Sequence, residues 1–350
     1  MGTRPEIIKN LAFCRAAKSI PGLKLDVLFT GQNFGPEMSS AQWKQLGIPI
    51  TRVSKGVDRT STGAIARDLM DFVTESIRLY KPDAVISNTD TDTAFYTALA
   101  AAKAKVPVVH IEGGIRCEAR LNPEELNRRL ADHLATWVFV ISPEDERSLL
   151  DEGFDRDRVF NLGDITNDAL KIVIKEHKIP IARGGYDLLT VHRQENVGDP
   201  KRLAAILEGV RRAGFPTRFP VHPRTRQALE RGEAKAILKK APNITLLPPQ
   251  PYLDLVRLLA GCRKLVSDSG GLRREGYLLD KPVISLVWFV WFKGMNRLGF
   301  EKVADADATA IEKALRTFDP KGKRPPLFGD GRAGERILRK TVQLLARRSR

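Results

Sequence analysis

The segment 84–116, AVISNTDTDTAFYTALAAAKAKVPVVHIEGGIR, indicates the fold of this chain. Two short apolar runs, Ala84–Ser87 and Val106–Ile111, flank a stretch that opens with polar residues and continues with helix formers. A strand, a helix and a second strand in this order are typical of a βαβ unit in a parallel sheet. The same alternation extends in both directions, so we expect an α/β protein.

Short apolar runs elsewhere predict the remaining strands, and amphipathic stretches predict helices between them. The expected strands are Leu25–Thr30, Trp137–Ile141, Val159–Leu162, Tyr186–Val191, Ile244–Leu247, Lys264–Ser267 and Val283–Leu286. The expected helices include Ala64–Leu79, Pro123–Ala135, Leu203–Arg212, Leu253–Leu259 and Glu335–Ala346. No internal repeat is visible, which argues against a solenoid.

A boundary between two α/β halves is predicted near residues 175–185, where charged residues and Pro180 lead to Gly184-Gly185. A chain of 350 residues is long enough for two domains with cores of their own. We therefore expect domains at 1–175 and 176–332. A phosphate-binding turn normally follows a strand, yet Gly2-Thr3-Arg4-Pro5 has no strand before it, so the first strand of the fold is expected to be missing.

Composition places the chain among ordinary globular proteins, with 42% hydrophobic and 29% charged residues. The net charge of +16 suits anionic partners such as phosphate-bearing substrates, nucleic acid or acidic lipid. However, Lys and Arg are dispersed and no RNA-binding signature occurs, so a solvated surface is the simpler interpretation and nucleic acid is not expected. Three cysteines show no metal-binding spacing, so we expect no metal. Without a signal-peptide pattern or an apolar run of about 18 residues, no membrane insertion is expected and the cytoplasm is predicted.

Residues that can do chemistry follow several of the expected strands. Asp90 comes after the strand 84–87, Glu112 with Gly113-Gly114 follows 106–111, and His192 follows 186–191. In an open parallel sheet, ligands bind beyond the carboxyl ends of the strands. Each residue also has a plainer interpretation, since Asp90 suits a helix cap and His192 a structural histidine. Their coincidence at strand ends favours a binding or catalytic site.

Helix starts supply candidate anion sites. Ser269-Gly270-Gly271 opens a helix, whose exposed N–H groups favour a phosphate. Glu275, one turn further, suits a ribose diol. Arg4 and Lys9 add positive charge near the helix that begins at Pro5. Pro123 also opens a helix, where Glu124 either interacts with the helix dipole and with Arg128 at i,i+4 or serves a site.

Taken together, these segments resemble the UDP-N-acetylglucosamine 2-epimerase family. The resemblance covers nearly the whole chain and rests on ordered segments: 2–9 (GTRPEIIK), 30–32 (TGQ), 110–116 (HIEGGIR), 123–128 (PEELNR), 192–196 (HRQEN) and 268–271 (DSGG). It implies a GT-B-like fold of two Rossmann-like domains with a ligand cleft between them and a C-terminal helix, 333–350, that packs back on the first domain. It further implies a homodimer that uses no metal, nicotinamide or other cofactor.

The resemblance also implies a reaction and roles for individual residues. The C2 proton of a UDP-N-acetylhexosamine is removed, UDP leaves by anti-elimination to give a 2-acetamidoglucal, and UDP adds back with the proton on the other face. Asp90, Glu112 and Glu124 resemble the acids that handle the proton and the intermediate, and His192 resembles the group that assists UDP departure. The implied UDP-sugar ligands are Arg4, Lys9, Gln250, Leu255, Ser269, Gly270, Gly271 and Glu275.

The chain departs from the family pattern at several positions. After Lys281-Pro282, the family carries a Thr-Glu-Arg-Pro-Glu segment whose Arg grips the diphosphate, whereas segment 287–294 here is VWFVWFKG, with only Lys293 to supply charge. Arg274 stands where an acid is usual, Gly113 replaces a common Ala, and Leu255 replaces an aromatic residue. The aromatic residues of 287–294 suit a different sugar pocket, a subunit contact or a buried strand end.

The leading hypothesis is epimerisation of UDP-N-acetylglucosamine to UDP-N-acetylmannosamine. One alternative is a hydrolysing 2-epimerase that releases UDP and N-acetylmannosamine. A GT-B glycosyltransferase with a nucleotide-sugar donor, or a non-catalytic nucleotide-sugar or nucleic-acid binder, forms a different class. Exchange of the C2 proton separates the epimerases from the other classes.

Overall fold

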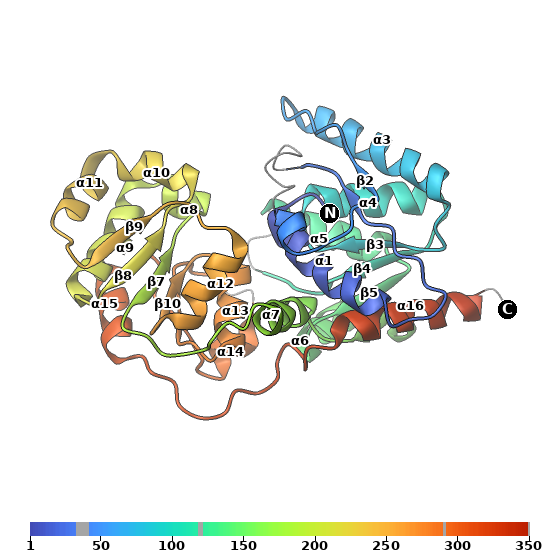
Figure 1. Ribbon diagram of the computed structural model, residues 1–350. Helices are drawn as coiled ribbons and strands as arrows, with labels where there is room; N and C mark the ends of the chain where they lie inside the picture. The colour runs from blue at the N-terminus through green and yellow to red at the C-terminus, as the bar shows by residue number, and fades with distance from the viewer. Residues whose placement is uncertain (33–41, 118–121, 290–291, 349–350) are drawn as a thin grey trace. The chain divides into compact units, whose positions relative to one another are not determined.

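The computed structural model describes residues 1–32, 42–117, 122–289 and 292–348. The chain divides into two compact units (Figure 1). Unit 1 contains Met1–Ile172 and Pro326–Arg350, and unit 2 contains Val173–Pro325. Each unit is a parallel β-sheet with helices packed against it, so the expected α/β class is confirmed.

Unit 1 alternates strands and helices from its first helix onward. Its elements are α1 (Arg4–Ala17), β1 (Leu28–Phe29), β2 (Arg52–Val53), α3 (Thr62–Tyr80), β3 (Val85–Asn88), α4 (Asp92–Lys103), β4 (Val108–Ile111), α5 (Pro123–Leu134), β5 (Trp137–Val140), α6 (Pro143–Asp151), the 3-10 turn η1 (Arg156–Arg158), β6 (Val159–Asn161), α7 (Ile165–Glu176, which runs into unit 2) and α16 (Ala333–Arg348). In the sheet β3-β4-β5-β6, the central strands β4 and β5 are buried throughout, and helix α4 packs on β3.

The C-terminal helix α16 belongs to unit 1, where it packs on α1 (Figure 1). A Cβ added at Gly334 would lie 3.3 Å from the Cβ of Ala12, a tight contact, so glycine favours the close approach of the two helices. The buried carboxylate of Asp168 accepts hydrogen bonds from the N–H groups of Ala333, at 3.1 Å, and Gly334, at 2.7 Å. These bonds cap the start of α16 and tie it to α7.

The sheet of unit 1 is interrupted between β1 and β3. Strands β1 and β2 pair in parallel with each other, and β3-β4-β5-β6 form a separate parallel sheet. No strand precedes the Gly2–Pro5 turn in the described chain: Met1 alone reaches β1, donating its N–H to the Leu28 carbonyl and accepting from the Thr30 N–H, each at 2.9 Å.

Unit 2 has the strand order of a nucleotide-binding sheet. Its strands are β7 (Asp187–Thr190), β8 (Thr217–Pro220), β9 (Ile244–Leu247), β10 (Leu265–Ser267), β11 (Val283–Ser285) and β12 (Glu301–Val303), arranged β12-β11-β10-β7-β8-β9. Its helices are α8 (Gln194–Val197), α9 (Pro200–Ala213), α10 (Pro223–Leu229), α11 (Gly232–Lys239), α12 (Tyr252–Gly261), α13 (Gly270–Leu278), α14 (Lys293–Arg297) and α15 (Ala308–Thr317). Counted along the chain this is the order 3-2-1-4-5-6 of the Rossmann fold, with its switch point between β7 and β10.

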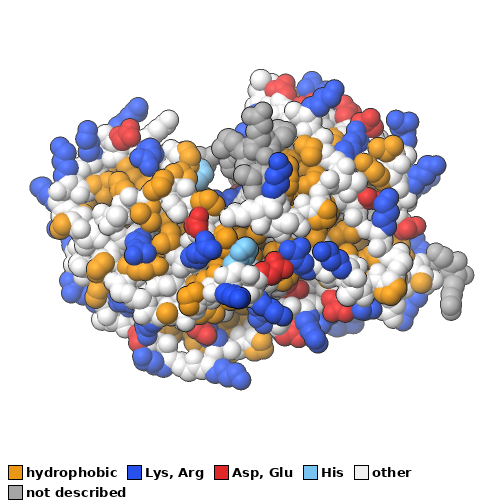
Figure 2. Space-filling model, in the orientation of Figure 1, with side chains coloured by type: hydrophobic (Ala, Val, Ile, Leu, Met, Phe, Trp, Pro, Cys, Tyr) orange, Lys and Arg blue, Asp and Glu red, His pale blue; other side chains and the backbone are white. Residues whose placement is uncertain are grey.

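Surface and membrane properties follow the composition. Figure 2 shows Lys and Arg side chains scattered over the visible face rather than gathered in one patch. Across the part of the chain that the structure describes, no helix combines the length and the apolar character needed to cross a membrane. Cys14, Cys117 and Cys262 are all buried, and burial raises the pKa of the Cys14 thiol to about 11.

Candidate functional site

In unit 1, two residues at neighbouring strand ends, one of them a candidate carboxylate, have a strained backbone. Thr89, between β3 and Asp90, has a φ of 74°, and Glu112, directly after β4, has a φ of 63°. Non-glycine residues adopt such left-handed conformations rarely, and they concentrate at functional sites. The alternative interpretation of Asp90 as a helix cap is wrong, because Thr91 is the N-cap of α4 and accepts the N–H of Ala94 at 3.2 Å.

A buried imidazole connects these two strand ends. The Nε2 atom of His110 lies 2.8 Å from the carbonyl oxygen of Thr89, and its Nδ1 atom lies 2.6 Å from Asp132 on α5. A carbonyl only accepts, so Nε2 carries a proton and donates it. His110 therefore holds the backbone turn that presents Asp90.

Asp132 is held as a carboxylate by its neighbours. Burial opposes its charge, but contacts with His110 and Arg116 outweigh burial and hold its pKa below the usual range. Arg116 lies 2.8 Å from its Oδ2 atom, which also accepts the Gly114 N–H at 3.1 Å. A Cβ at Gly113 would overlap the carboxylate of Asp132, so this glycine lets the loop after β4 approach α5. No sequence motif reveals the contact between His110 and Asp132, because the two residues lie 22 positions apart in the chain.

Glu112 forms a buried ion pair with Lys9. The two side-chain atoms lie 2.5 Å apart, and about 7% and 6% of the Lys9 and Glu112 side chains are exposed. Lys9 comes from α1, so the pair joins the first helix to the end of β4. A buried carboxylate is tolerated when a cation neutralises it. The diphosphate-binding role expected for Lys9 stays a prediction, and its observed partner is the acid Glu112.

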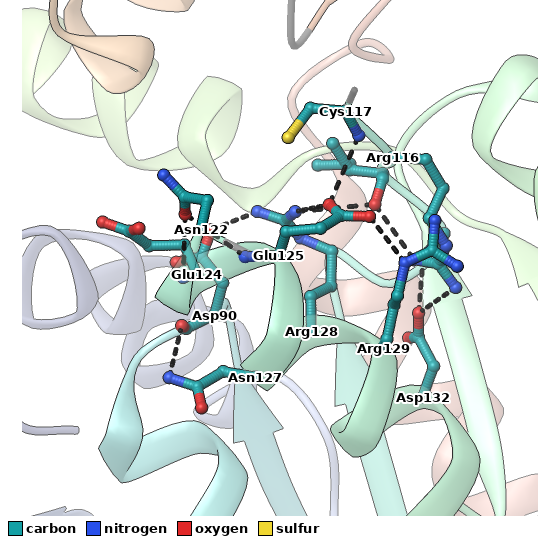
Figure 3. Close-up of polar contacts among 12 residues, drawn as sticks. Asp90, Arg116, Cys117, Asn122, Glu124, Glu125, Asn127, Arg128, Arg129 and Asp132 are labelled. Carbon is teal, nitrogen blue, oxygen red and sulfur yellow. Dashed lines mark hydrogen bonds and ion pairs between the residues drawn. The ribbon is translucent and has the colours of Figure 1, made fainter. Parts of the chain in front are cut away.

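Arg128 on α5 gathers two further carboxylates (Figure 3). It forms an ion pair with Asp90, whose side chain is about 28% exposed, and a second with Glu125 at 3.1 Å. The expected pairing of Arg128 with Glu124 is wrong, because helix α5 turns Glu125 rather than Glu124 toward Arg128. In Figure 3 the side chain of Glu124 points away from Arg128, and this residue is half-buried at the start of α5.

Glu6 links the first turn of α1 to the loop after β3. Its carboxylate accepts the N–H groups of Gly2 and Thr3, the latter at 3.0 Å. It also accepts the hydroxyl groups of Thr89 at 3.2 Å and Thr91 at 2.5 Å. Arg4, the expected diphosphate ligand in the same turn, is half-buried. The capping-box spacing of Thr3 and Glu6 is visible in the sequence, whereas the contacts with the β3 end are not.

In unit 2, the site lies at the switch point of the sheet. His192 follows β7 and Asp268 follows β10, two strands that pair directly. The buried Asp268 carboxylate lies 3.0 Å from Nδ1 of His192 and accepts the N–H groups of His192 and Arg193 at about 3.0 Å. The side chain of His192 is about 40% exposed. Because Nδ1 contacts Asp268, the other ring nitrogen, Nε2, points away from Asp268.

Asp268 is ionised under all ordinary conditions. Burial would raise its pKa, but the His192 imidazole and the N–H groups of His192 and Arg193 outweigh burial and lower the pKa to about 2. A carboxylate on Nδ1 fixes the imidazole tautomer and leaves Nε2 for proton transfer. The sequence places both His192 and Asp268 after strands, but it does not reveal that the two side chains pair.

The expected anion cradle stands next to this pair. Ser269 is the N-cap of α13, and its hydroxyl accepts the N–H of Leu272 at 3.3 Å. Ser269, Gly270 and Gly271 are all partly exposed, and a Cβ at Gly271 would meet open space. The first N–H groups of a helix are free of intrahelical partners and attract anions.

The expected uridine contacts lie on two further elements of unit 2. Glu275, nearly buried in α13, accepts the hydroxyl of Tyr252 at 2.7 Å. Leu255 is half-buried on α12, and Gln250 precedes that helix and donates to the carbonyl of Pro248 at 2.7 Å. The structure describes where each residue stands, and their binding roles stay predictions.

The aromatic segment after β11 packs against arginines of the same unit. Phe289 is buried beneath Arg193, 5.3 Å from the guanidinium carbon to the ring centre, and Phe292 stands 4.8 Å from Arg274 in the same way. Trp288 is about 55% exposed. Trp291, expected to belong to the same pocket or contact, lies outside the described residues. An arginine over an aromatic ring is a favourable contact. Arg193 and Arg274 therefore pack on this segment through its aromatic rings rather than through a carboxylate.

Side chains for a metal site are not gathered anywhere in the described chain. No group of three or more His, Cys, Asp or Glu is arranged to hold a metal ion within residues 1–32, 42–117, 122–289 and 292–348. Instead, Glu112 and Asp90 of unit 1 form ion pairs with Lys9 and Arg128. Asp268 of unit 2 contacts His192.

Two parallel sheets with acids, an imidazole and a helix N-terminus at their strand ends define a nucleotide-sugar enzyme of the GT-B-like α/β class. The sequence profile of the UDP-N-acetylglucosamine 2-epimerase family matches residues 15–341, and the chain belongs to that family. It is 30% identical to the UDP-N-acetylglucosamine 2-epimerase of Methanocaldococcus jannaschii, over 97% of this chain and 96% of that one.

Two further comparisons bear on the fold and on the substrate. The crystal structure of the Methanocaldococcus jannaschii enzyme in complex with UDP-GlcNAc and UDP superposes with a TM-score of 0.88 at 28% identity, over 98% of both chains. The UDP-2,3-diacetamido-2,3-dideoxy-D-glucuronate 2-epimerase of Pseudomonas aeruginosa is 29% identical over 98% of both chains. The GT-B-like expectation is thereby confirmed.

Proposed function

We propose that the chain interconverts UDP-N-acetylglucosamine and UDP-N-acetylmannosamine. The observation that carries the proposal is the pairing of His192 with the buried Asp268 beside the start of α13. This arrangement places a proton-transferring imidazole next to a helix N-terminus that attracts phosphate. Family membership supports the choice of a 2-epimerase over other nucleotide-sugar enzymes.

The carboxylates of unit 1 are proposed to move the C2 proton. In the forward direction the C2–H bond breaks, a carboxylate takes the proton, and the electron pair forms a C1–C2 double bond. Asp90, Glu112 and Glu124 are the candidate bases. A C2–H bond that is not next to a carbonyl is weakly acidic, so its cleavage needs a fixed base and a stabilised leaving group. Lys9 and Arg128 support this role because they hold Glu112 and Asp90 in place.

The groups of unit 2 are proposed to bind UDP and help it leave. When the C1–O bond breaks, its electron pair goes to the departing phosphate oxygen, which takes a proton from Nε2 of His192. Ser269, Gly270 and Gly271 offer hydrogen-bond donors to the diphosphate, as does Arg4 of unit 1, and Glu275 accepts the ribose hydroxyls. UDP then adds back to C1, its phosphate oxygen returns the proton to Nε2 of His192, and a carboxylic acid delivers a proton to the other face of C2, so that atoms and charge balance.

Proton NMR of UDP-N-acetylglucosamine with the protein in heavy water tests the proposal. We expect UDP-N-acetylmannosamine to appear, with deuterium at C2 of both sugars. Free N-acetylmannosamine with UDP would instead establish the hydrolysing epimerase. Unchanged C2 protons, with transfer of the sugar to an added acceptor, would establish a glycosyltransferase. Binding without any exchange would leave only a nucleotide-sugar binder and overturn the proposal.

The sugar itself is tested by competition. The relative from Pseudomonas aeruginosa is named for a diacetamido uronate, and the segment after β11 is aromatic in this chain. We propose UDP-N-acetylglucosamine as the preferred substrate because the family is named for it. Equal concentrations of the two UDP-sugars in one tube should give faster C2 exchange for UDP-N-acetylglucosamine; faster exchange of the uronate would reassign the substrate.

Assembly and location complete the proposal. We propose a homodimer, as the family resemblance implies, and light scattering after size exclusion should give twice the mass of 39.0 kDa. We also propose that the protein acts in the cytoplasm, because a charged UDP-sugar does not cross a bilayer unaided. Cell fractionation checks this location, and no nucleic acid is expected to co-purify in high salt.

A further inference from the structure

Trp288, in the segment after β11, is a large aromatic residue at the surface of unit 2. About 55% of it is exposed, whereas its neighbours Val287 and Phe289 are almost fully buried. The two buried neighbours anchor the segment on either side of Trp288 and leave the indole ring open to a ligand. Tryptophan is highly buried on average in folded proteins, so an exposed one calls for an explanation.

The backbone of this segment is attached to the candidate site of unit 2. Leu286 donates its N–H to the carbonyl of Ser267 at 3.0 Å, which places Leu286 level with the end of β10. The side-chain amide of Asn196 donates both to the carbonyl of Leu286, at 3.0 Å, and to the buried carboxylate of Asp268, at 3.2 Å. The residue that contacts Asp268 therefore also fixes the chain two positions before Trp288.

Side-chain contacts place Trp288 on the His192 side of this site. The rings of Trp288 and Phe289 meet edge to face, with their centres 5.4 Å apart and their planes at 89°. Phe289 also contacts Arg193, whose guanidinium carbon lies 5.3 Å from the ring centre. Arg193 directly follows His192 in the chain. The ring of Phe289 therefore connects Trp288 to the loop that carries His192.

The groups of unit 2 stand in an order that matches the parts of a UDP-sugar. Under the proposed function, Glu275 marks the ribose, the start of α13 marks the diphosphate, and His192 marks the phosphate oxygen that leaves C1. The hexose is the next group beyond that oxygen. Because Phe289 connects Trp288 to the His192 loop, Trp288 stands at the hexose end of this series.

We propose that Trp288 is a specificity-determining residue whose ring packs against the hexose of the bound UDP-sugar. This inference rests on the proposed function, which supplies the ligand. A pyranose ring presents C–H groups on its faces, and aromatic side chains are common in ligand pockets because they offer such groups a large apolar surface. The same surface favours a neutral N-acetylhexosamine over a uronate, because an indole face offers no cation to a carboxylate that has lost its water.

Binding of UDP and of UDP-N-acetylglucosamine to variants of Trp288 tests the proposal. We expect Trp288→Ala to weaken binding of UDP-N-acetylglucosamine by about tenfold in calorimetry, through loss of the aromatic contact. Binding of UDP should stay unchanged, because UDP carries no hexose. Trp288→Phe keeps an aromatic face and should restore most of the affinity. The matched control is Ile181→Ala, which removes a similarly exposed apolar side chain before β7 and should alter neither ligand.

Competition between two sugars gives a second readout. UDP-N-acetylglucosamine and UDP-2,3-diacetamido-2,3-dideoxy-D-glucuronate, the sugar for which the relative from Pseudomonas aeruginosa is named, are mixed at equal concentration in heavy water. The ratio of their C2 exchange rates reports the ratio of their kcat/KM values. We expect Trp288→Ala to reduce the preference for the neutral sugar by about tenfold, and Ile181→Ala to leave it as in the unchanged chain.

Two results would overturn the assignment of Trp288. Equal weakening of UDP and UDP-N-acetylglucosamine by Trp288→Ala would assign the residue to the nucleotide or to folding. Unchanged affinity for both ligands would show that the ring does not touch the sugar. Failure of the proposed function has a different signature, because C2 exchange would then be absent from the unchanged chain, whereas the comparison of UDP with UDP-N-acetylglucosamine needs no turnover.

Discussion

The centres of the two sheets differ in what they present to a ligand. In unit 2, β7 ends at an imidazole that is about 40% exposed and is held by one buried carboxylate, Asp268. In unit 1, the neighbouring strands β3 and β4 lead to acids that already have cations, Asp90 with Arg128 and Glu112 with Lys9. This difference supports the proposed roles, in which unit 1 moves a proton and unit 2 binds an anion.

Removing the charge of a unit 1 acid should have the largest effect on turnover. We expect Asp90→Asn and Glu112→Gln each to lower kcat by about 10³-fold or more, since general acid–base catalysis contributes 10²–10⁴-fold. UDP affinity, measured by calorimetry, should stay unchanged. The control is Asp71→Asn on α3, an exposed carboxylate outside the site. Full epimerase activity in both site variants would remove the acids from the mechanism.

Changing the imidazole of unit 2 should have the next largest effect. His192→Asn is expected to lower kcat by about 10²-fold, because the leaving phosphate loses its proton donor. A kcat that falls while UDP affinity holds would show that His192 acts in the reaction step rather than in binding. An equal loss of both quantities would contradict the proton-donor role.

The pH dependence of folding tests how Asp268 is held. Its pKa is lowered from 3.8 to about 2, so it contributes stability above its unfolded pKa that is lost as the pH falls from about 4 toward 2. The contribution is roughly 2 kcal/mol, and Asp268→Asn should lose it. Urea unfolding at a series of pH values measures the slope. The control is Asp319→Asn, whose carboxylate has a similar pKa of about 2 but is about 33% exposed, so salt should screen its effect.

Glu275 should give the smallest effect, confined to binding. Glu275→Gln is expected to weaken UDP by about tenfold, since a hydrogen bond to a charged group contributes about 1.5–3 kcal/mol. Tyr252→Phe keeps the carboxylate and removes only the hydroxyl that donates to it at 2.7 Å. It should cost less affinity than Glu275→Gln. The reverse order, measured by calorimetry with UDP, would assign the ribose contact elsewhere.

Much of the fold was predictable, because every expected strand is present and the candidate residues follow strand ends. The strands that were missed in the described chain have unfavourable compositions: β2 contains Arg52, β8 contains Arg218 and Pro220, and β12 contains Glu301. Glu301 is fully buried because Arg273, distant in sequence, lies 2.9 Å from it. Apolar periodicity does not reveal a strand whose burial depends on such a partner.

The candidate site was predictable as a set of acids and an imidazole, but not as a set of pairs. Local sequence motifs place Glu112, with its neighbour Gly113, and His192 in loops that follow strands. Which cation meets which acid depends on packing between distant elements, as in the contact of Lys9 with Glu112. Helical spacing alone favoured Glu124 as the partner of Arg128, whereas the fold turned Asp90 toward it.

The return of α16 to unit 1 has a consequence for synthesis on the ribosome. Unit 2, residues 173–325, is contiguous, so it can fold as soon as it has left the exit tunnel. Unit 1 must wait until residues 333–348 are made, because Asp168 caps a helix that is translated after all of unit 2. Unit 1 is thus synthesised first but completes its folding after unit 2. During that interval, the face of α1 that α16 covers stays accessible to chaperones.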